Sequence, residues 1–72
     1  MKGGDKVADI NLLKGKIVAK GYNLTSFASA IGMPFATFHR RIKSRVFGSD
    51  EIETIAKTLD LSQDEIMNIF FN

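Results

Sequence analysis

Apolar residues recur along this chain at steps of three and four positions, and strict alternation of apolar with polar residues is absent. This spacing gathers apolar side chains on one face of an α-helix, whereas a half-buried strand would place them at every second position. The pattern therefore predicts an all-α protein. Four helices are expected at about residues 7–20, 24–30, 35–44 and 50–59, and a fifth begins after residue 62.

Capping residues predict where several of these helices begin and end. Gly21 supplies a stop for the first helix. Asn23 or Thr25 can accept hydrogen bonds from the free amides that open the second helix. Ser62 and Glu65 have the spacing of a capping box, in which each side chain accepts from the other residue's backbone amide, and they predict the start of the fifth helix.

The periodicity also predicts one shared core. A chain of 72 residues is close to the smallest that folds alone, since it hides only roughly 60% of its unfolded surface. We expect a single domain at residues 7–72, preceded by a flexible polar segment at residues 1–6. The residues expected to face inward are Ile10, Leu13, Ile17, Phe27, Ala28, Ile31, Phe38, Ile42, Ile52, Ile55, Ala56 and Leu59. In the fifth helix the apolar residues occupy nearly the whole circumference: Ile66, Met67, Ile69, Phe70 and Phe71.

Charge is distributed unevenly along the chain, although the formal net charge is only +2. No Asp or Glu occurs between Asp9 and Asp50, and acidic residues predominate afterwards. Clustered cations on one face attract phosphates, so the asymmetry suits a domain that turns one face to a polyanion; a solvated polar face is the alternative. The cations of the acid-free stretch are Lys14, Lys16, Lys20, Arg40, Arg41, Lys43 and Arg45.

Several function classes have no support in the sequence. Cysteine is absent and His39 is the single histidine, so neither a metal site nor a disulfide is expected, and no cofactor is expected. The serines and threonines near residue 26 lack a second histidine or an oxyanion loop, so we expect no catalysis and no small-molecule substrate. No apolar run has the length of a membrane span, and a soluble, cytoplasmic protein is expected.

The most specific pattern lies at residues 24–42. A small residue, Ala28, allows two helices to touch, and Gly32 stands where a left-handed residue lets the chain reverse. Met33 fills the space beneath the turn, and Phe38 anchors the second of the two helices at a steep angle to the first. This segment is therefore expected to form a helix, a tight turn and a second helix.

The pattern Ala28-x-x-x-Gly32-Met33-x-x-x-x-Phe38-x-x-x-Ile42 resembles the helix-turn-helix of the Cro and phage-repressor family. The resemblance covers nearly the whole chain, because a preceding helix and two following helices complete the five-helix, lambda-repressor-like domain of that family. Further likeness to short regulators of temperate phages and Gram-positive bacteria lies in residues 12–17, 49–53 and 64–71. It implies a sequence-specific transcriptional regulator in a bacterial host cell, with double-stranded DNA as its partner.

The resemblance also implies residue roles, because in that family the third helix lies in the major groove. Arg40 could donate two hydrogen bonds to a guanine, and His39 could donate or accept one. The expected base-facing residues are Phe35, Ala36, His39 and Arg40. The expected phosphate contacts are Thr37, Arg41, Lys43 and Arg45, together with the amides that open the second helix.

Two positions depart from the family pattern and motivate a second hypothesis. Leu24 stands where many members have a glutamine, and Phe35 stands where a polar residue is usual. Phe35 can therefore be a reader of methyl groups, a core residue or an anchor for protein. The last option fits an antirepressor or modulator of repression, which would use the same fold to bind the DNA-binding domain of a phage repressor.

Aromatic residues near the C-terminal end allow two further interpretations. Phe70 and Phe71 are expected either in the core or as apolar surface for a second copy of the chain, which would give a symmetric homodimer. The candidates for a protein interface are thus Leu24, Phe35, Phe70 and Phe71.

Overall fold

The computed structural model describes residues 7–71, and these residues form five α-helices and no strand. The helices are α1 (Ile10–Ala19), α2 (Leu24–Ala30), α3 (Phe35–Ser44), α4 (Ser49–Leu59) and α5 (Gln63–Phe70). The all-α prediction is confirmed for this part of the chain, and the bounds of α2 and α3 agree with the expected ones. The expected flexible segment at residues 1–6 lies outside the described residues.

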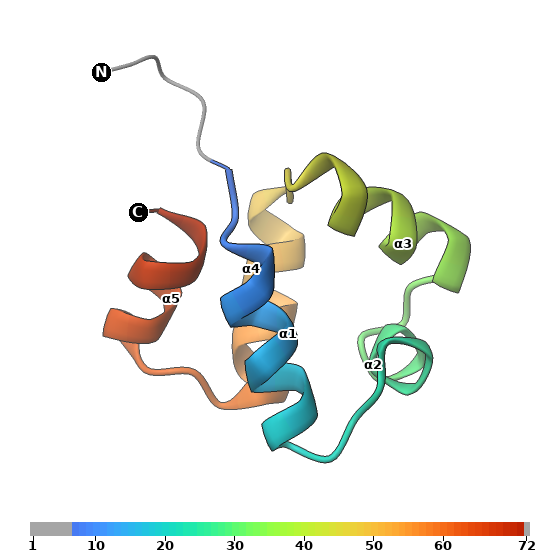
Figure 1. Cartoon of the computed structure of the whole chain (residues 1–72), viewed down its shortest axis with the longest axis horizontal. Coiled ribbons are helices and arrows are strands. Elements are labelled where there is room, and N and C mark those ends of the chain that lie inside the picture. Colours follow the sequence, from blue (N-terminus) through green and yellow to red (C-terminus); the bar gives the residue numbers. More distant parts are fainter. Residues whose placement is uncertain (1–6, 72) are drawn as a thin grey trace.

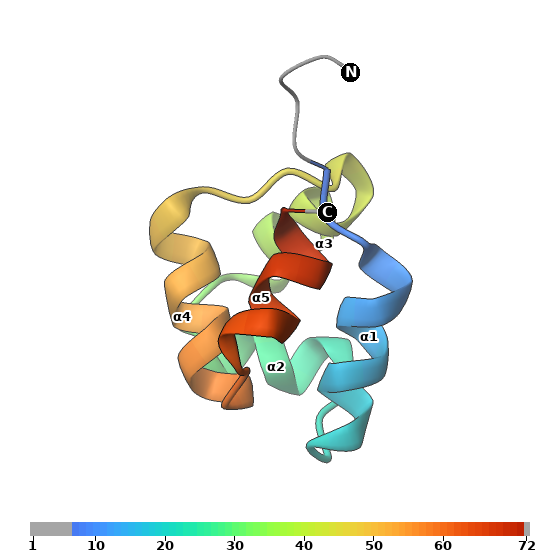
Figure 2. The ribbon, with the colours of Figure 1, turned by 90° about the vertical axis from the view of Figure 1, so that its left-hand side faces the viewer.

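The helices form two groups that share one core. In Figures 1 and 2, α1, α4 and α5 stand roughly upright beside one another. The other two helices cross steeply, since Figure 1 shows α2 nearly end-on while α3 runs across the view. α2 packs against both α1 and α3, and α1 also packs against α5. α2 therefore lies between α3 and α1 in the packing.

The buried core contains most of the residues that the periodicity predicts. Its members are Ala8, Ile10, Leu13, Ile17, Phe27, Ala28, Phe38, Ile42, Ile55, Leu59, Ile69 and Phe70. The apolar residues of the fifth helix divide between core and surface: α5 buries one face through Ile69 and Phe70, while Met67 is 49% exposed. Phe71 is 39% exposed, so the core interpretation of Phe71 is wrong and the surface interpretation remains.

The first helix begins later than expected, at Ile10 and not at residue 7. Asp9 caps it, because its carboxylate accepts a hydrogen bond from the Leu12 amide at 3.1 Å. The backbone before α1 forms hydrogen bonds to other segments instead of helical ones. The Ala8 amide donates to the Arg45 carbonyl at 2.8 Å, and the Asp9 amide donates to the Ile69 carbonyl at 2.7 Å. Residues 7–9 therefore join the end of α3 to the end of α5, which a local sequence pattern cannot show.

The junction between α2 and α3 is a tight turn with a left-handed glycine. Gly32 has φ +72°, and the Met33 amide closes the turn by donating to the Ala28 carbonyl at 2.9 Å. At the other end of α2, Asn23 accepts from the Ser26 amide at 2.7 Å, and the Ser26 hydroxyl accepts from the Asn23 amide at 3.0 Å. Asn23, rather than Thr25, is therefore the cap of α2.

An ion pair fastens α5 to α1. The Lys16 ammonium lies 2.5 Å from a carboxylate oxygen of Glu65, and each side chain is 34% exposed. Glu65 also completes the capping box of α5, since its carboxylate accepts from the Ser62 amide at 2.8 Å. The bond from Lys16, followed by the one from the Ser62 amide, lowers the pKa of Glu65 from 4.5 to about 2.

Two glycines offer a matched test of backbone conformation. A Cβ added at Gly15 or at Gly32 would meet no atom within 4 Å, so the two positions differ in backbone angle and not in space. Gly15→Ala should raise the free energy of unfolding by about 0.5 to 1 kcal/mol, because alanine is the better helix former. Gly32→Ala should lower it by about 1 to 2 kcal/mol, because φ is positive there. Urea denaturation measures both, and equal effects would contradict the assigned turn.

The ion pair between Lys16 and Glu65 should make stability depend on acid pH. Because the pKa of Glu65 is lowered from 4.5 to about 2, its contribution is complete above 4.5 and is lost as the pH falls towards 2. Lys16→Met should therefore shrink the loss of stability across that range, measured from urea midpoints at several pH values. Lys57→Met is the control, because Lys57 pairs only across 3.8 Å with exposed Glu53. If Lys16→Met loses as much stability as the unaltered chain when the pH falls from 4.5 towards 2, the ion pair is not the cause of the pH dependence.

Candidate nucleic-acid interface

One face of α3 is fixed to the core and the opposite face is open. Phe38 is fully buried and Ile42 is 6% exposed, and the Phe38 ring packs on Phe27 of α2 with centroids 5.7 Å apart. Ala28 of α2 is 1% exposed, in keeping with the small residue that a close helix contact requires. The exposed side chains on α3 are Phe35, Ala36, His39, Arg40, Lys43 and Ser44.

Phe35 belongs to the exposed face, so the interpretation of Phe35 as a core residue is wrong. Its side chain is 44% exposed and its ring stacks on His39, with centroids 5.7 Å apart and planes at 23°. Phe35 occupies the first position of α3, at the end of the helix that lies farthest from α1 and α5 (Figure 1). The two rings make an aromatic surface at the tip of α3.

Two of the seven cations in the acid-free stretch are already paired within the fold. Lys16 pairs with Glu65, and the Nε of Arg41 lies 3.0 Å from a carboxylate oxygen of Glu51. Glu51 in turn accepts from the Gly48 amide at 2.8 Å and so holds the start of α4. The remaining five cations form no ion pair with any other residue of the range 7–71. They are Lys14, Lys20, Arg40, Lys43 and Arg45.

The structure places the other expected contacts less openly. Thr37 is half-buried on α3, and Leu24 is half-buried against the core at the start of α2. The Asn23 cap uses the Ser26 amide, which is one of the amides expected to face phosphate. Leu24 and Thr37 can therefore offer only part of their side chains to a partner.

Phe70 is not available as an interface residue, which corrects the expectation from the sequence. It is 3% exposed, and its ring meets Phe47 edge-on with centroids 5.8 Å apart. Phe47 comes from the loop between α3 and α4, and periodicity does not predict a partner from a loop. Phe71, one residue further, remains exposed together with Met67.

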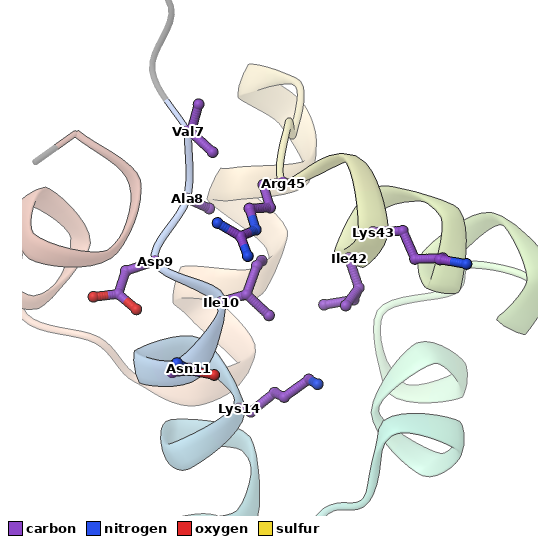
Figure 3. A pocket seen from close by; sticks show the side chains of 9 residues that line it. All are labelled: Val7, Ala8, Asp9, Ile10, Asn11, Lys14, Ile42, Lys43 and Arg45. Atoms are coloured by element: carbon purple, nitrogen blue, oxygen red, sulfur yellow. The ribbon is translucent and has the colours of Figure 1, made fainter.

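A feature that the sequence analysis missed lies beside the end of α3. Lys14 from α1 lines a cleft together with Lys43 and Arg45 from the end of α3 (Figure 3). The absence of acidic residues between Asp9 and Asp50 is the signal that could have pointed to it. The sequence pattern shows that this part of the chain is positively charged. Only the folded structure shows that the start of α1 lies beside the end of α3.

The described part of the chain contains neither a candidate metal site nor a membrane-spanning helix. Within residues 7–71, no three side chains of His, Asp or Glu lie close enough together to hold a metal ion. No helix in the same range is both long and apolar enough to cross a membrane.

Comparisons with known proteins give no relative from which a role could be transferred. No model of a protein family, no curated protein and no solved structure matches the chain. The proposals below therefore depend on the residues and their geometry, together with the resemblance of the motif.

Proposed function

We propose that this chain is a sequence-specific DNA-binding transcriptional regulator of the Cro and phage-repressor type, acting in the cytoplasm of a bacterial host. In this proposal α2 and α3 are the helix-turn-helix of a lambda-repressor-like domain. The observation that carries it is the two-sided character of α3, which is held by Phe38 and Ile42 while His39 and Arg40 face solvent. A helix supported in this way can enter a groove without disturbing its own core.

The major groove of B-DNA is about 12 Å wide and admits an α-helix. Arg40 would read a guanine through two parallel hydrogen bonds, and His39 would donate or accept one bond at a neighbouring base. Ala36 and the Phe35 ring would offer apolar contact, for instance to a thymine methyl. These contacts specify the sequence, while contacts to phosphate fix the position of the helix along the duplex.

Phosphate contacts are proposed for Thr37, Lys43 and Arg45, and Arg41 needs a separate description. Its Nε is bound to Glu51, and its side chain is still 42% exposed. A guanidinium has five N–H donors, so Arg41 can keep this bond and offer other donors to a phosphate. Glu51 would then hold Arg41 in a fixed position before DNA arrives.

A second copy of the chain would complete the regulator. Two-fold dimers of helix-turn-helix proteins place their reading helices about 34 Å apart, one turn of the duplex. Met67 and Phe71 leave apolar surface exposed on and after α5, and this surface is the proposed contact in place of the buried Phe70.

DNA binding can be tested without knowledge of the operator. Selection from a pool of random duplexes should enrich one sequence, and its affinity should fall steeply as salt rises. Arg40→Ala should relax the preference at one base pair by about 1 to 3 kcal/mol, measured by fluorescence anisotropy on single-base variants of the selected duplex. Lys57→Ala on α4 is the charge-matched control and should leave the preference unchanged. Failure to enrich any sequence would count against the proposal.

A second candidate function is supported by the exposed aromatic surface at the tip of α3. An antirepressor or modulator of repression would press Phe35 into the DNA-binding domain of a repressor, because aromatic residues contribute strongly at protein interfaces. The stacked Phe35 and His39 rings favour this candidate, since a 44% exposed phenylalanine is unusual on a surface that reads polar base edges. In this case the chain would act on transcription without touching DNA.

Substitution of Phe35 separates the two candidates. If the chain binds a repressor, Phe35→Ser should abolish co-elution on a sizing column with the repressor encoded by an adjacent gene. Val18→Ser is the control, because Val18 is an exposed apolar residue on α1, 68% against 44%, and has no part in a proposed interface. Both substitutions are at exposed sites and should change the free energy of unfolding by less than about 1 kcal/mol. Tight DNA binding by the free chain, unaffected by Phe35→Ser, would rule out this second function.

A further inference from the structure

A cleft of about 510 Å³ separates the start of α1 from the end of α3 (Figure 3). Ile10 of α1 and Ile42 of α3 lie at its apolar base, and both are almost fully buried. Lys14, Lys43 and Arg45 supply the charged lining, and they come from two helices that are far apart in sequence. The cleft is therefore a product of tertiary packing and combines apolar walls with cationic groups.

The charge of this cleft is not balanced from within the described chain. Lys14, Lys43 and Arg45 form no ion pair with any other residue of the range 7–71. Asp9 is the one acidic side chain in the lining, and its carboxylate caps α1 through the Leu12 amide. Figure 3 shows the Asp9 carboxylate pointing away from Arg45 and Lys14. Cations gathered in one cleft with no carboxylate directed at them raise the local potential and attract an anion.

The backbone of Arg45 joins the two segments that border the cleft. Arg45 ends α3 with φ +64°, a left-handed conformation in which glycine is the usual residue. Its carbonyl accepts from the Ala8 amide at 2.8 Å, which fixes this conformation beside the first residues of α1. Asp60 ends α4 in the same left-handed region with φ +53°, so this conformation is a common way to end a helix, and the bond to Ala8 is what ties Arg45 to the start of the chain beside the cleft.

The cleft also continues the exposed face of α3. Lys43 follows His39 by four residues, so the two side chains are neighbours on one side of the helix. The same line of residues begins at Phe35, whose ring stacks on His39. A duplex strand that runs beside α3 would therefore pass from the aromatic tip, along Lys43, to Lys14 on α1.

We propose that this cleft binds a phosphate group and that the group is a backbone phosphodiester of the DNA that α3 reads. The inference rests on the proposed function and extends it, because it gives α1 a direct part in binding through Lys14. Arg45 would donate two parallel hydrogen bonds to the phosphate oxygens, and Lys14 and Lys43 would act as point charges on either side. A phosphate held at this place would fix how far α3 can travel along the groove.

The test compares two charge-matched variants on a duplex of mixed sequence. Lys14→Gln should lower the affinity and reduce the slope of log K against log salt by up to about 0.9, the value for the complete loss of one phosphate contact. Lys57→Gln removes the same charge from α4 and should leave the slope unchanged. Lys43→Gln is the second cleft variant and should repeat the effect of Lys14→Gln. Circular dichroism and thermal melting establish that each variant is folded.

The outcomes separate this inference from the proposed function. If the unaltered chain binds duplex DNA and Lys14→Gln behaves as Lys57→Gln does, the cleft inference is overturned and the DNA-binding function stands. If the unaltered chain binds no duplex, the proposed function fails, and titration with inorganic phosphate then decides the cleft. If phosphate shifts the NMR amide signals of residues 8–14 in the unaltered chain but not in Lys14→Gln, the cleft is a binding site for free phosphate. Unchanged amide signals would overturn the site as well.

Discussion

The left-handed turn at Gly32 is the constraint on which the arrangement of the other helices depends. With φ +72°, it ends α2 abruptly and lets α3 cross back over it, so that Phe38 meets Phe27 in the core. An L residue with a side chain resists this conformation, so glycine suits the position. Pro34, which caps α3 with ψ 142°, also prevents residues 24–44 from forming one continuous helix. The open face of α3 exists because the turn sets that helix against α2 by one side only.

Ion pairing then decides which cations remain for a partner. Glu65 and Glu51 come from the acidic last third of the chain, and they neutralise Lys16 and Arg41 from the stretch between Asp9 and Asp50 that has no acidic residue. The pairs fasten α5 to α1 and α4 to α3, so they also stabilise the fold. Of the cations left unpaired within the described residues, Arg40 lies on the open face of α3, and Lys14, Lys43 and Arg45 line the cleft beside α1, while Lys20 stands apart at the end of α1. The asymmetry of charge thus serves both packing and recognition in our proposal.

Much of the fold could be predicted from the sequence, because its signals are local. Apolar spacing and capping residues act within one or two helical turns, and they placed α2 and α3 and assigned the cap of α5 to Ser62. The errors fall where a distant residue decides the outcome. Residues 7–9 lie outside the helix, and the carbonyls of Arg45 and Ile69 accept the amides of Ala8 and Asp9. The choice between the two interpretations of Phe70 also involves a distant residue, since the buried Phe70 ring packs edge-on against Phe47. Periodicity carries no information about such partners.

The same division holds for the candidate site. By itself the sequence determined that α3 would be amphipathic, that its outer positions would be cationic and that Gly32 would make a turn, because each property depends on residue type and on spacing along one helix. Tertiary structure alone decided that Phe35 is exposed, that Arg41 is tied to Glu51, and that Lys14 joins Lys43 and Arg45 in one cleft. The physical reason is that exposure, ion pairing and cavities are properties of surfaces brought together from distant segments, and their geometry exists only after the helices have packed.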